Sequence, residues 1–304
     1  MDFVQIKKDI EELDVGRIIE DEPMYKHTTY KVGGPARIYL KVKDIDSLIK
    51  TLKYCKDNQV KHKVIGRGSN LLFSDREYDG IIISLNEYFT KVSINGCTIK
   101  AQAGVMMINL AYQAGKIGLS GFEFMGGIPG SIGGGIFMNA GAYKYDIASV
   151  VKSVTLLDEN YQVVTYLKEQ MQFSYRHSIC QDNRKLIVLE AEFELAPKDP
   201  EEIKAVLDKR KERRMATQPW NMPSAGSVFR NPENHPAWKY VDECGLRGYE
   251  IGGAQVSPKH SNFIVNNGYA SAKDIYDLIM LVQTKVKEKY GVNLKREVEL
   301  VNWE

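Results

Sequence analysis

The chain has 304 residues, which is enough for about two domains at roughly 150 residues each. Hydrophobic residues make up 43% and charged residues 26%, proportions that exclude a disordered or fibrous chain. The 41 basic and 39 acidic residues leave a net charge of +2, which gives no support to a nucleic-acid or membrane-surface role. The charged N-terminus lacks the apolar stretch of a signal peptide, and no run approaches the roughly 18 apolar residues of a membrane span. We therefore expect a cytoplasmic protein with no membrane span.

Four cysteines are spread widely along the chain, and no two of them form a C-x-x-C pair. This spacing matches neither a zinc site nor a secreted disulfide framework. We expect reduced thiols and no metal.

The first part of the chain alternates helical and strand patterns. A short amphipathic helix is expected over residues 1–15, because apolar residues recur at helical spacing, and a loop through Pro23 follows it. The patterns then predict helices at 44–58 and 106–116, and strands at 37–42, 63–65, 80–84 and 98–101.

The second part begins with an expected hairpin at 150–158 and 161–167, followed by a strand at 186–195. Asp199 and Pro200 are typical of a helix start, and Gly291 is expected to stop a helix over 271–290. A last strand is expected at 294–301. These alternating elements predict an α+β protein with a larger region, 1–198, and a smaller one, 199–304.

Glycine is unevenly distributed. Ten of the 25 glycines lie between Gly115 and Gly141. Glycines cost backbone entropy, so such a cluster needs a physical reason. The bulky residues among them, such as Ile132 and Phe137, argue against a flexible linker. Consecutive backbone N–H groups can hold phosphate oxygens without a charged side chain, so phosphate binding is the favoured interpretation.

The two common nucleotide motifs do not fit the cluster. A Rossmann fingerprint that starts at Gly133 and Gly135 needs a third glycine at position 138, where this chain has Met138. A Walker loop needs a lysine directly after Gly135, where this chain has Ile136. A second loop, Gly66 to Asn70, follows a predicted strand, the position where α/β sheets bind ligands. Two such loops suggest a larger phosphate ligand held from both sides, such as a dinucleotide.

These loops and several later motifs resemble those of the UDP-N-acetylenolpyruvoylglucosamine reductase (MurB) family. The resemblance rests on Gly66-Arg67-Gly68-Ser69-Asn70, Gly127-Ile128-Pro129-Gly130-Ser131-Ile132-Gly133-Gly134, Tyr175-Arg176-His177-Ser178, Ser224-Ala225-Gly226-Ser227-Val228-Phe229-Arg230-Asn231-Pro232 and Arg296-Glu297-Val298. It covers nearly the whole chain in order. It implies a two-subdomain vanillyl-alcohol-oxidase/PCMH-type FAD-binding fold over 1–198 and a smaller α+β substrate domain over 199–304, from which the last strand could return to the FAD region.

The resemblance also implies an activity, the reduction of an enolpyruvyl ether of a UDP-sugar to UDP-N-acetylmuramate, with NADPH as co-substrate and non-covalent FAD as cofactor. The product serves peptidoglycan synthesis. Hydride addition leaves a carbanion-like centre beside a carboxylate, so the reaction asks for a cation or donor at the carboxylate, for an acid near the carbon, and for a group that settles their protonation. The family motifs supply these groups at Arg176, Ser227 and Glu297.

Further site residues follow from the same motifs. The implied FAD contacts are Gly66, Arg67, Gly68, Ser69, Asn70, Gly127, Ile128, Pro129, Gly130, Ser131, Gly133, Gly134, Asn139, Ala140 and Gly141. The candidate substrate contacts are Arg214, Asn231 and His260. His260 lies in the segment Ser257-Pro258-Lys259-His260-Ser261-Asn262, which also resembles a family segment on the substrate side. Only about ten residues separate Arg176 from the next strand, too few for a folded insertion, so the chain resembles the shorter, second class of the family.

Two other functions stay open. An oxidase of an alcohol or hydroxy acid could use the same fold, although many such oxidases attach flavin to a histidine in the first glycine loop, where this chain has Asn70. A nucleotide- or nucleic-acid-binding module without catalysis could use the basic run 209–214, although a solvated helix end explains that run as well.

Overall fold

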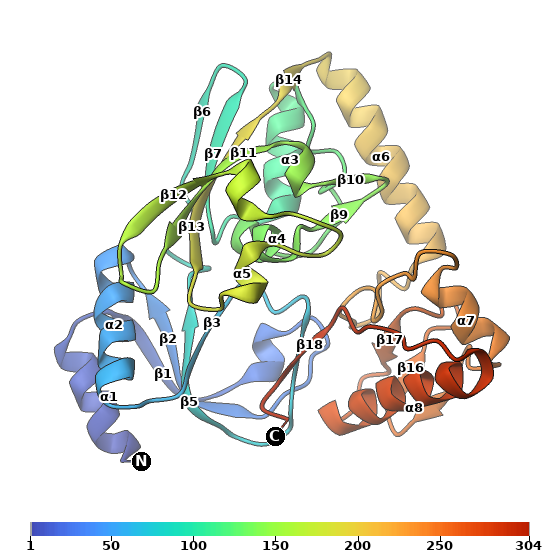
Figure 1. Ribbon diagram of the computed structural model, residues 1–304, viewed down its shortest axis with the longest axis horizontal. Helices are drawn as coiled ribbons and strands as arrows, with labels where there is room; N and C mark the ends of the chain where they lie inside the picture. The colour runs from blue at the N-terminus through green and yellow to red at the C-terminus, as the bar shows by residue number, and fades with distance from the viewer. Residues whose placement is uncertain (1, 304) are drawn as a thin grey trace. The chain divides into compact units, whose positions relative to one another are not determined.

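The computed structural model describes residues 2–303, which form two compact units (Figure 1). Unit 1 comprises residues 2–20, 37–67 and 80–212, and unit 2 comprises residues 21–36, 68–79 and 213–303. Each unit is assembled from three separate stretches of the chain. The division into a FAD-binding region, 1–198, and a substrate-binding region, 199–304, stays a prediction.

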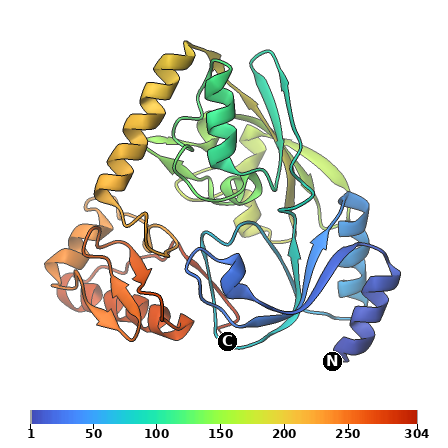
Figure 2. The same cartoon turned by 180° about the vertical axis from the view of Figure 1, so that it is seen from behind.

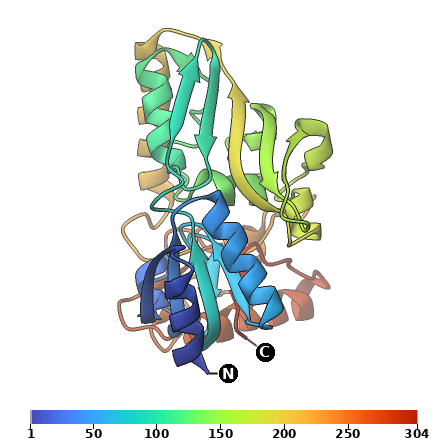
Figure 3. The ribbon, with the colours of Figure 1, turned by 90° about the vertical axis from the view of Figure 1, so that its left-hand side faces the viewer.

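The first sheet of unit 1 has four strands in the order β1-β2-β5-β3. Helices α1 and α2 lie beside it (Figure 3), and the Tyr54 hydroxyl of α2 donates to Asp9 of α1 over 2.6 Å. The elements are β1 (Gly16–Pro23), β2 (Pro35–Val42), β3 (His62–Ile65), β5 (Tyr78–Ser84), α1 (Phe3–Glu12) and α2 (Ile45–Asp57). Strand β3 runs parallel to β5. Gly66 follows directly after the carboxyl end of β3.

The second sheet of unit 1 is antiparallel throughout, in the order β12-β11-β13-β7-β6. Helix α4 contacts β13 and β7 on one face of this sheet (Figure 2). The strands are β6 (Val92–Asn95), β7 (Thr98–Gln102), β11 (Val151–Leu157), β12 (Val163–Leu167) and β13 (Ile187–Glu194).

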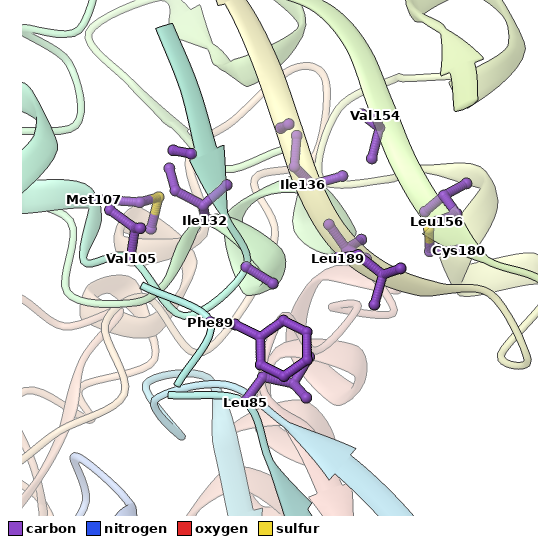
Figure 4. Close-up of a cluster of buried hydrophobic side chains, with 14 of the residues drawn as sticks. Leu85, Phe89, Val105, Met107, Ile132, Ile136, Val154, Leu156, Cys180 and Leu189 are labelled. Carbon is purple, nitrogen blue, oxygen red and sulfur yellow. The ribbon is translucent and has the colours of Figure 1, made fainter. Parts of the chain in front are cut away.

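Shorter elements complete unit 1. They are α3 (Met107–Lys116), β8 (Leu119–Ser120), α4 (Ile132–Met138), β9 (Gly141–Ala142), β10 (Tyr145–Asp146), η2 (Ile147–Ser149), η3 (Lys168–Met171), α5 (Ile179–Asp182), β14 (Ala196–Pro197) and the first part of α6 (Pro200–Thr217). One apolar core joins both sheets and these helices. In Figure 4, Ile132 and Ile136 of α4 lie in the same cluster as Val154 of β11 and Leu189 of β13.

Unit 2 has a core of its own, formed around a three-stranded antiparallel sheet and helix α8. The elements are η1 (Met24–His27), β4 (Leu71–Phe73), α7 (Ala237–Glu243), β15 (Glu250–Ile251), β16 (Ala254–Val256), β17 (Ile264–Asn266), α8 (Ala272–Tyr290) and β18 (Glu299–Val301). The last strand, β18, pairs in parallel with β4, with Glu299 opposite Leu71.

The predicted ends of two helices are confirmed. The carboxylate of Asp199 accepts a hydrogen bond of 2.9 Å from the Glu201 N–H, and α6 begins at Pro200. Helix α8 ends at Gly291, which has the left-handed backbone conformation (φ 70°) that glycine adopts without strain.

Three expectations were wrong in detail. The expected loop before Pro23 is strand β1, which lies at the edge of its sheet, where charged residues and a terminal proline are tolerated. Part of the glycine cluster is helix α4 rather than loop. The last strand, β18 (Glu299–Val301), is shorter than the expected 294–301. Arg296 lies outside it and forms a separate bridge with Phe229.

Over residues 2–303, none of the helices combines the length and the apolar character needed to cross a membrane.

Ile136 is fully buried between α4 and the second sheet of unit 1. We expect Ile136→Ala to lower the free energy of unfolding by about 2–5 kcal/mol, because it removes buried methylenes and leaves a cavity. Urea denaturation followed by circular dichroism measures the change. Val163→Ala, at a position that is 51% exposed, is the matched control. Equal losses in the two variants would contradict the placement of α4 in the core.

Candidate active site

The two glycine loops meet in unit 1. A Cβ atom added to Gly66 would lie 2.6 Å from the Ser131 hydroxyl oxygen and 3.9 Å from the backbone nitrogen of Gly134. Ser131 is buried at the start of α4, where its hydroxyl accepts a hydrogen bond of 3.5 Å from the Gly134 N–H. A side chain at position 66 would force the Ser131 hydroxyl or the loop itself to move.

Local hydrogen bonds fix each loop from its own side. The Asn86 amide donates to the carbonyl of Gly66 over 2.9 Å. In the second loop, the Met107 N–H donates to the Gly130 carbonyl over 3.1 Å, and the Ile132 N–H donates to Val105 over 2.9 Å. The loops are therefore held by the ends of the sheets and helices around them.

Several glycines of the cluster serve packing. An added Cβ would lie 3.0 Å from the Ala103 side chain at Gly133, 2.6 Å from the Met107 sulfur at Gly135 and 2.4 Å from Leu207 at Gly126. These glycines let α4 and its neighbours approach the core closely. The cluster is thus partly a structural feature.

Other positions of the cluster suit a phosphate ligand. No atom of residues 2–303 accepts a hydrogen bond from the backbone N–H groups of Gly130 and Ser131. At Gly134, which is exposed, an added Cβ would meet only the Ser131 hydroxyl oxygen, at 3.7 Å. Backbone donors beside an open surface at the start of a helix are suited to an anion, so the loop fits the diphosphate of FAD.

The second half of the first loop belongs to unit 2. Gly68 has a left-handed backbone (φ 63°), and an added Cβ would lie 2.0 Å from the carbonyl oxygen of His27, so only glycine fits there. The Asn70 side chain donates to the carbonyl of Glu297 over 2.9 Å, and Asn70 accepts from the Glu299 N–H over 2.9 Å. The first glycine loop therefore contacts the backbone of a predicted catalytic residue.

Ser227 and Glu297 lie on neighbouring segments of unit 2. The Glu297 N–H donates to the carbonyl of Val228, the residue after Ser227, over 2.8 Å. Phe229 and Arg296 form an antiparallel bridge at the next position. The structure thus brings together two predicted catalytic residues that lie far apart in the sequence.

Arg176 belongs to unit 1, in a turn closed by two hydrogen bonds between Ser174 and His177. Its backbone is left-handed (φ 57°), and its guanidinium donates to the carbonyl of Gly141 over 2.9 Å. The Gln181 side chain donates to the Arg176 carbonyl over 2.9 Å. Strain and hydrogen bonds of this kind fix the direction in which a side chain leaves the backbone.

Asn139 supports the same turn. It is buried, ends α4 in the left-handed conformation, and donates to Ser174 over 2.9 Å and to Asp146 over 3.0 Å. The N–H groups of Asn139 and Ala140 bond to carbonyls of α4. Any contact of these two residues with FAD must therefore come from other atoms.

The three candidate substrate contacts all lie in unit 2. Arg214 donates through Nε to Gln218 over 2.7 Å, and the side-chain oxygen of Asn231 accepts from the Ala237 N–H at the start of α7 over 3.0 Å. Burial lowers the pKa of His260 below its ordinary value. A neutral imidazole can offer a phosphate a hydrogen bond but no charge.

Comparison with known proteins gives the family. Residues 218–301 match the C-terminal domain of UDP-N-acetylenolpyruvoylglucosamine reductase, and residues 36–166 match an FAD-binding domain. The chain is 44% identical to UDP-N-acetylenolpyruvoylglucosamine reductase 1 of Bacillus cereus over 98% of its own length and 99% of that protein. The chain belongs to the UDP-N-acetylenolpyruvoylglucosamine reductase family. The predicted family and its α+β flavoprotein fold are confirmed.

Further members of the UDP-N-acetylenolpyruvoylglucosamine reductase family agree. The Bacillus licheniformis reductase is 44% identical over 98% of both chains. The crystal structure of the MurB reductase of Thermus caldophilus superposes with a TM-score of 0.79 at 31% identity, over 93% of this chain and 98% of that one. FAD and NADPH are the cofactor and co-substrate of this family, as the sequence predicted. Between Arg176 and β13 the chain has only α5 and short loops.

Two residues with evident roles in the site's backbone were not singled out from the sequence. Asn262, which is buried, forms three hydrogen bonds with Val228 and Phe229. Gln181 bonds to the carbonyl of Arg176. A buried amide that bonds to a distant backbone has no local sequence pattern, so spacing alone could not have identified Asn262. Gln181 stands five residues after Arg176, so its nearness to the Tyr-Arg motif is a sequence signal for its contact with that turn.

We expect Gly66→Ala to lose bound FAD, because the new methyl group would push the first loop away from Ser131. The ratio of flavin to protein absorbance after purification measures this loss. Gly96→Ala, in the turn between β6 and β7, is the control for backbone strain without a clash, because Gly96 has a left-handed backbone (φ 56°) and no atom lies within 4 Å of its added Cβ. Full FAD occupancy in Gly66→Ala would contradict the proposed binding site.

Proposed function

We propose that this protein is a UDP-N-acetylmuramate dehydrogenase, which reduces the enolpyruvyl ether of UDP-N-acetylglucosamine with NADPH in the synthesis of peptidoglycan precursors. The observation that carries the proposal is the 44% identity to a reductase of this name over nearly the full length of both chains. Bound FAD supplies the hydride transfer between NADPH and the enolpyruvyl group. The glycine loops at Gly66–Asn70 and Gly127–Gly134 hold its diphosphate in this proposal.

Ser227 is the proposed proton donor. A serine hydroxyl is a weak acid, but a carbanion beside a carboxylate is a strong enough base to take its proton. The backbone next to Ser227 is fixed by the Glu297 N–H on one side and by Asn262 on the other. A donor that is fixed in this way loses little entropy when it transfers its proton.

Arg176 is proposed to stabilise the negative charge that develops on the substrate carboxylate, and Glu297 to settle the protonation of the groups around it. The backbone of Glu297 is bonded through its N–H to Val228 and through its carbonyl to Asn70, so the carboxyl group starts from a fixed point. The guanidinium of Arg176 is a planar group of N–H donors that can bind a carboxylate with two hydrogen bonds. A cation or donor of this kind is what a carboxylate-stabilised carbanion needs.

Arg214, Asn231 and His260 are proposed to bind the substrate diphosphate. Arg214 would supply charge, whereas Asn231 and the neutral His260 would supply hydrogen bonds.

We also propose a cytoplasmic location, non-covalent FAD, and no nucleic-acid partner. The last of these is in keeping with the net charge of +2. The first glycine loop has no histidine to which flavin could be attached, and this argues against the oxidase alternative. Its Asn70 side chain bonds to the Glu297 backbone.

Spectra of the purified protein test the function. We expect a flavin spectrum that bleaches on addition of NADPH and returns, without oxygen, when the enolpyruvyl sugar nucleotide is added. An anaerobic sample without the sugar nucleotide is the control. Flavin that is reduced by simple alcohols and reoxidised by oxygen with release of peroxide would support the oxidase instead, and a protein that takes up no FAD would support the binding module.

We expect Ser227→Ala to slow reoxidation of the flavin by substrate at least tenfold, since removing a proton donor of this kind typically costs about 10²–10⁴-fold. Reduction by NADPH should stay within about twofold of wild type, because that step needs no proton from Ser227. Stopped-flow absorbance measures the two half-reactions separately. Equal loss in both would contradict the proton-donor role.

A further inference from the structure

A single buried side chain holds the backbone that follows Ser227. The Asn262 side-chain oxygen accepts from the Phe229 N–H over 3.0 Å, and its side-chain nitrogen donates to the Phe229 carbonyl over 2.8 Å. The Asn262 carbonyl accepts from the Val228 N–H over 2.8 Å. Asn262 is only 3% exposed. It therefore bonds three times to the two residues that directly follow Ser227.

The chemistry of these bonds requires an amide. Phe229 presents one donor and one acceptor, and an amide of this length offers the matching acceptor and donor. An aspartate has the same shape, but its carboxylate only accepts, so it would face the Phe229 carbonyl without a proton to share. Leaving a buried carbonyl unpaired costs about 1–3 kcal/mol, and a negative charge beside it costs more. The segment would move to relieve this contact.

Asn262 is itself fixed by its neighbours. The Ser257 hydroxyl accepts from the N–H groups of Lys259 and His260, over 3.2 and 3.3 Å. The Asn262 N–H donates to the His260 ring over 3.3 Å, and Ser261 donates to Asp242 of α7. The amide is therefore supported on a rigid turn.

We propose that Asn262 is a positioning residue for proton transfer, acting through the Val228–Phe229 backbone on Ser227. This inference rests on the proposed role of Ser227 as proton donor. On its other side, Val228 accepts the hydrogen bond from Glu297, so a shift of this segment displaces both groups. A displacement of about 1 Å at a reacting group can slow a step by about 10²-fold.

Asn266 is a matched control within unit 2. It is also buried, at 4% exposure, and its amide donates to the Tyr30 carbonyl over 3.0 Å and accepts from the N–H groups of Gly268 and Ala270. The partners of its side chain belong to other segments than the one that carries Ser227. Its backbone N–H donates to the Pro223 carbonyl over 2.9 Å, a bond that does not depend on the side chain. Replacing Asn266 by aspartate thus repeats the same chemical change with the same loss of a buried donor.

The experiment compares Asn262→Asp with Asn266→Asp in the FAD-loaded protein. We expect Asn262→Asp to slow flavin reoxidation by the enolpyruvyl sugar nucleotide at least tenfold, while NADPH reduces its flavin within about twofold of the wild-type rate. Asn266→Asp should change both half-reactions by less than about twofold, even where its thermal midpoint falls. Loss of both half-reactions in Asn262→Asp, normal reoxidation, or the same selective loss in Asn266→Asp would overturn the inference.

A double variant separates positioning from a general loss of structure. If Asn262 acts through Ser227, then Ser227→Ala combined with Asn262→Asp should reoxidise about as slowly as Ser227→Ala alone, because the group being positioned is already gone. Losses that multiply would overturn the inference and indicate an independent structural effect.

The outcomes also separate this inference from the proposed mechanism. Normal reoxidation in Ser227→Ala contradicts the role of Ser227, and the inference falls with it. A slow Ser227→Ala beside a normal Asn262→Asp removes the role of Asn262 alone. If Asn262→Asp does not fold, Asn262→Ala, which removes both side-chain bonds without adding charge, repeats the test, and failure of both variants to fold overturns the inference in favour of a structural role.

Discussion

The part of the candidate site that lies in unit 2 depends on the backbone of Glu297. Its N–H bonds to Val228 and its carbonyl bonds to the Asn70 side chain. Three segments that are remote in sequence therefore meet at one residue: the first glycine loop, the segment of Ser227, and the end of the chain. Because these are bonds to the backbone, they set the position of Glu297 whatever its side chain does.

The glycine cluster shows how one compositional signal can have two causes. Gly133 and Gly135 are needed because α4 packs closely on Ala103 and Met107. Gly66 is needed because its loop touches Ser131, and Gly130 and Ser131 present N–H groups that no described residue accepts. The same stretch thus packs a short helix closely against the core and presents backbone N–H groups of the kind that suit an anion.

Local patterns predicted much of the fold, and distant contacts were beyond them. The helix that starts after Asp199 and the helix that ends at Gly291 follow from capping residues, which act over one turn. Strand β1 and the short β18 depend on their partners, which no local pattern reveals. The motifs that carry Arg176, Ser227 and Glu297 pointed to the site, and Asn262 stands in a segment that resembles the family, but its role was not predicted because it acts on Phe229 across 33 positions.

The pairing of β18 with β4 has a consequence for the order in which the protein can form. Residues 71–73 are synthesised long before their partners at 299–301. The bond from Asn70 to Glu297 spans 227 positions. Contacts of such long range form late and slowly. The second half of the first glycine loop therefore reaches its final surroundings only after residues 297–301 have been synthesised, so the early part of unit 2 waits for a much later segment before it can finish folding.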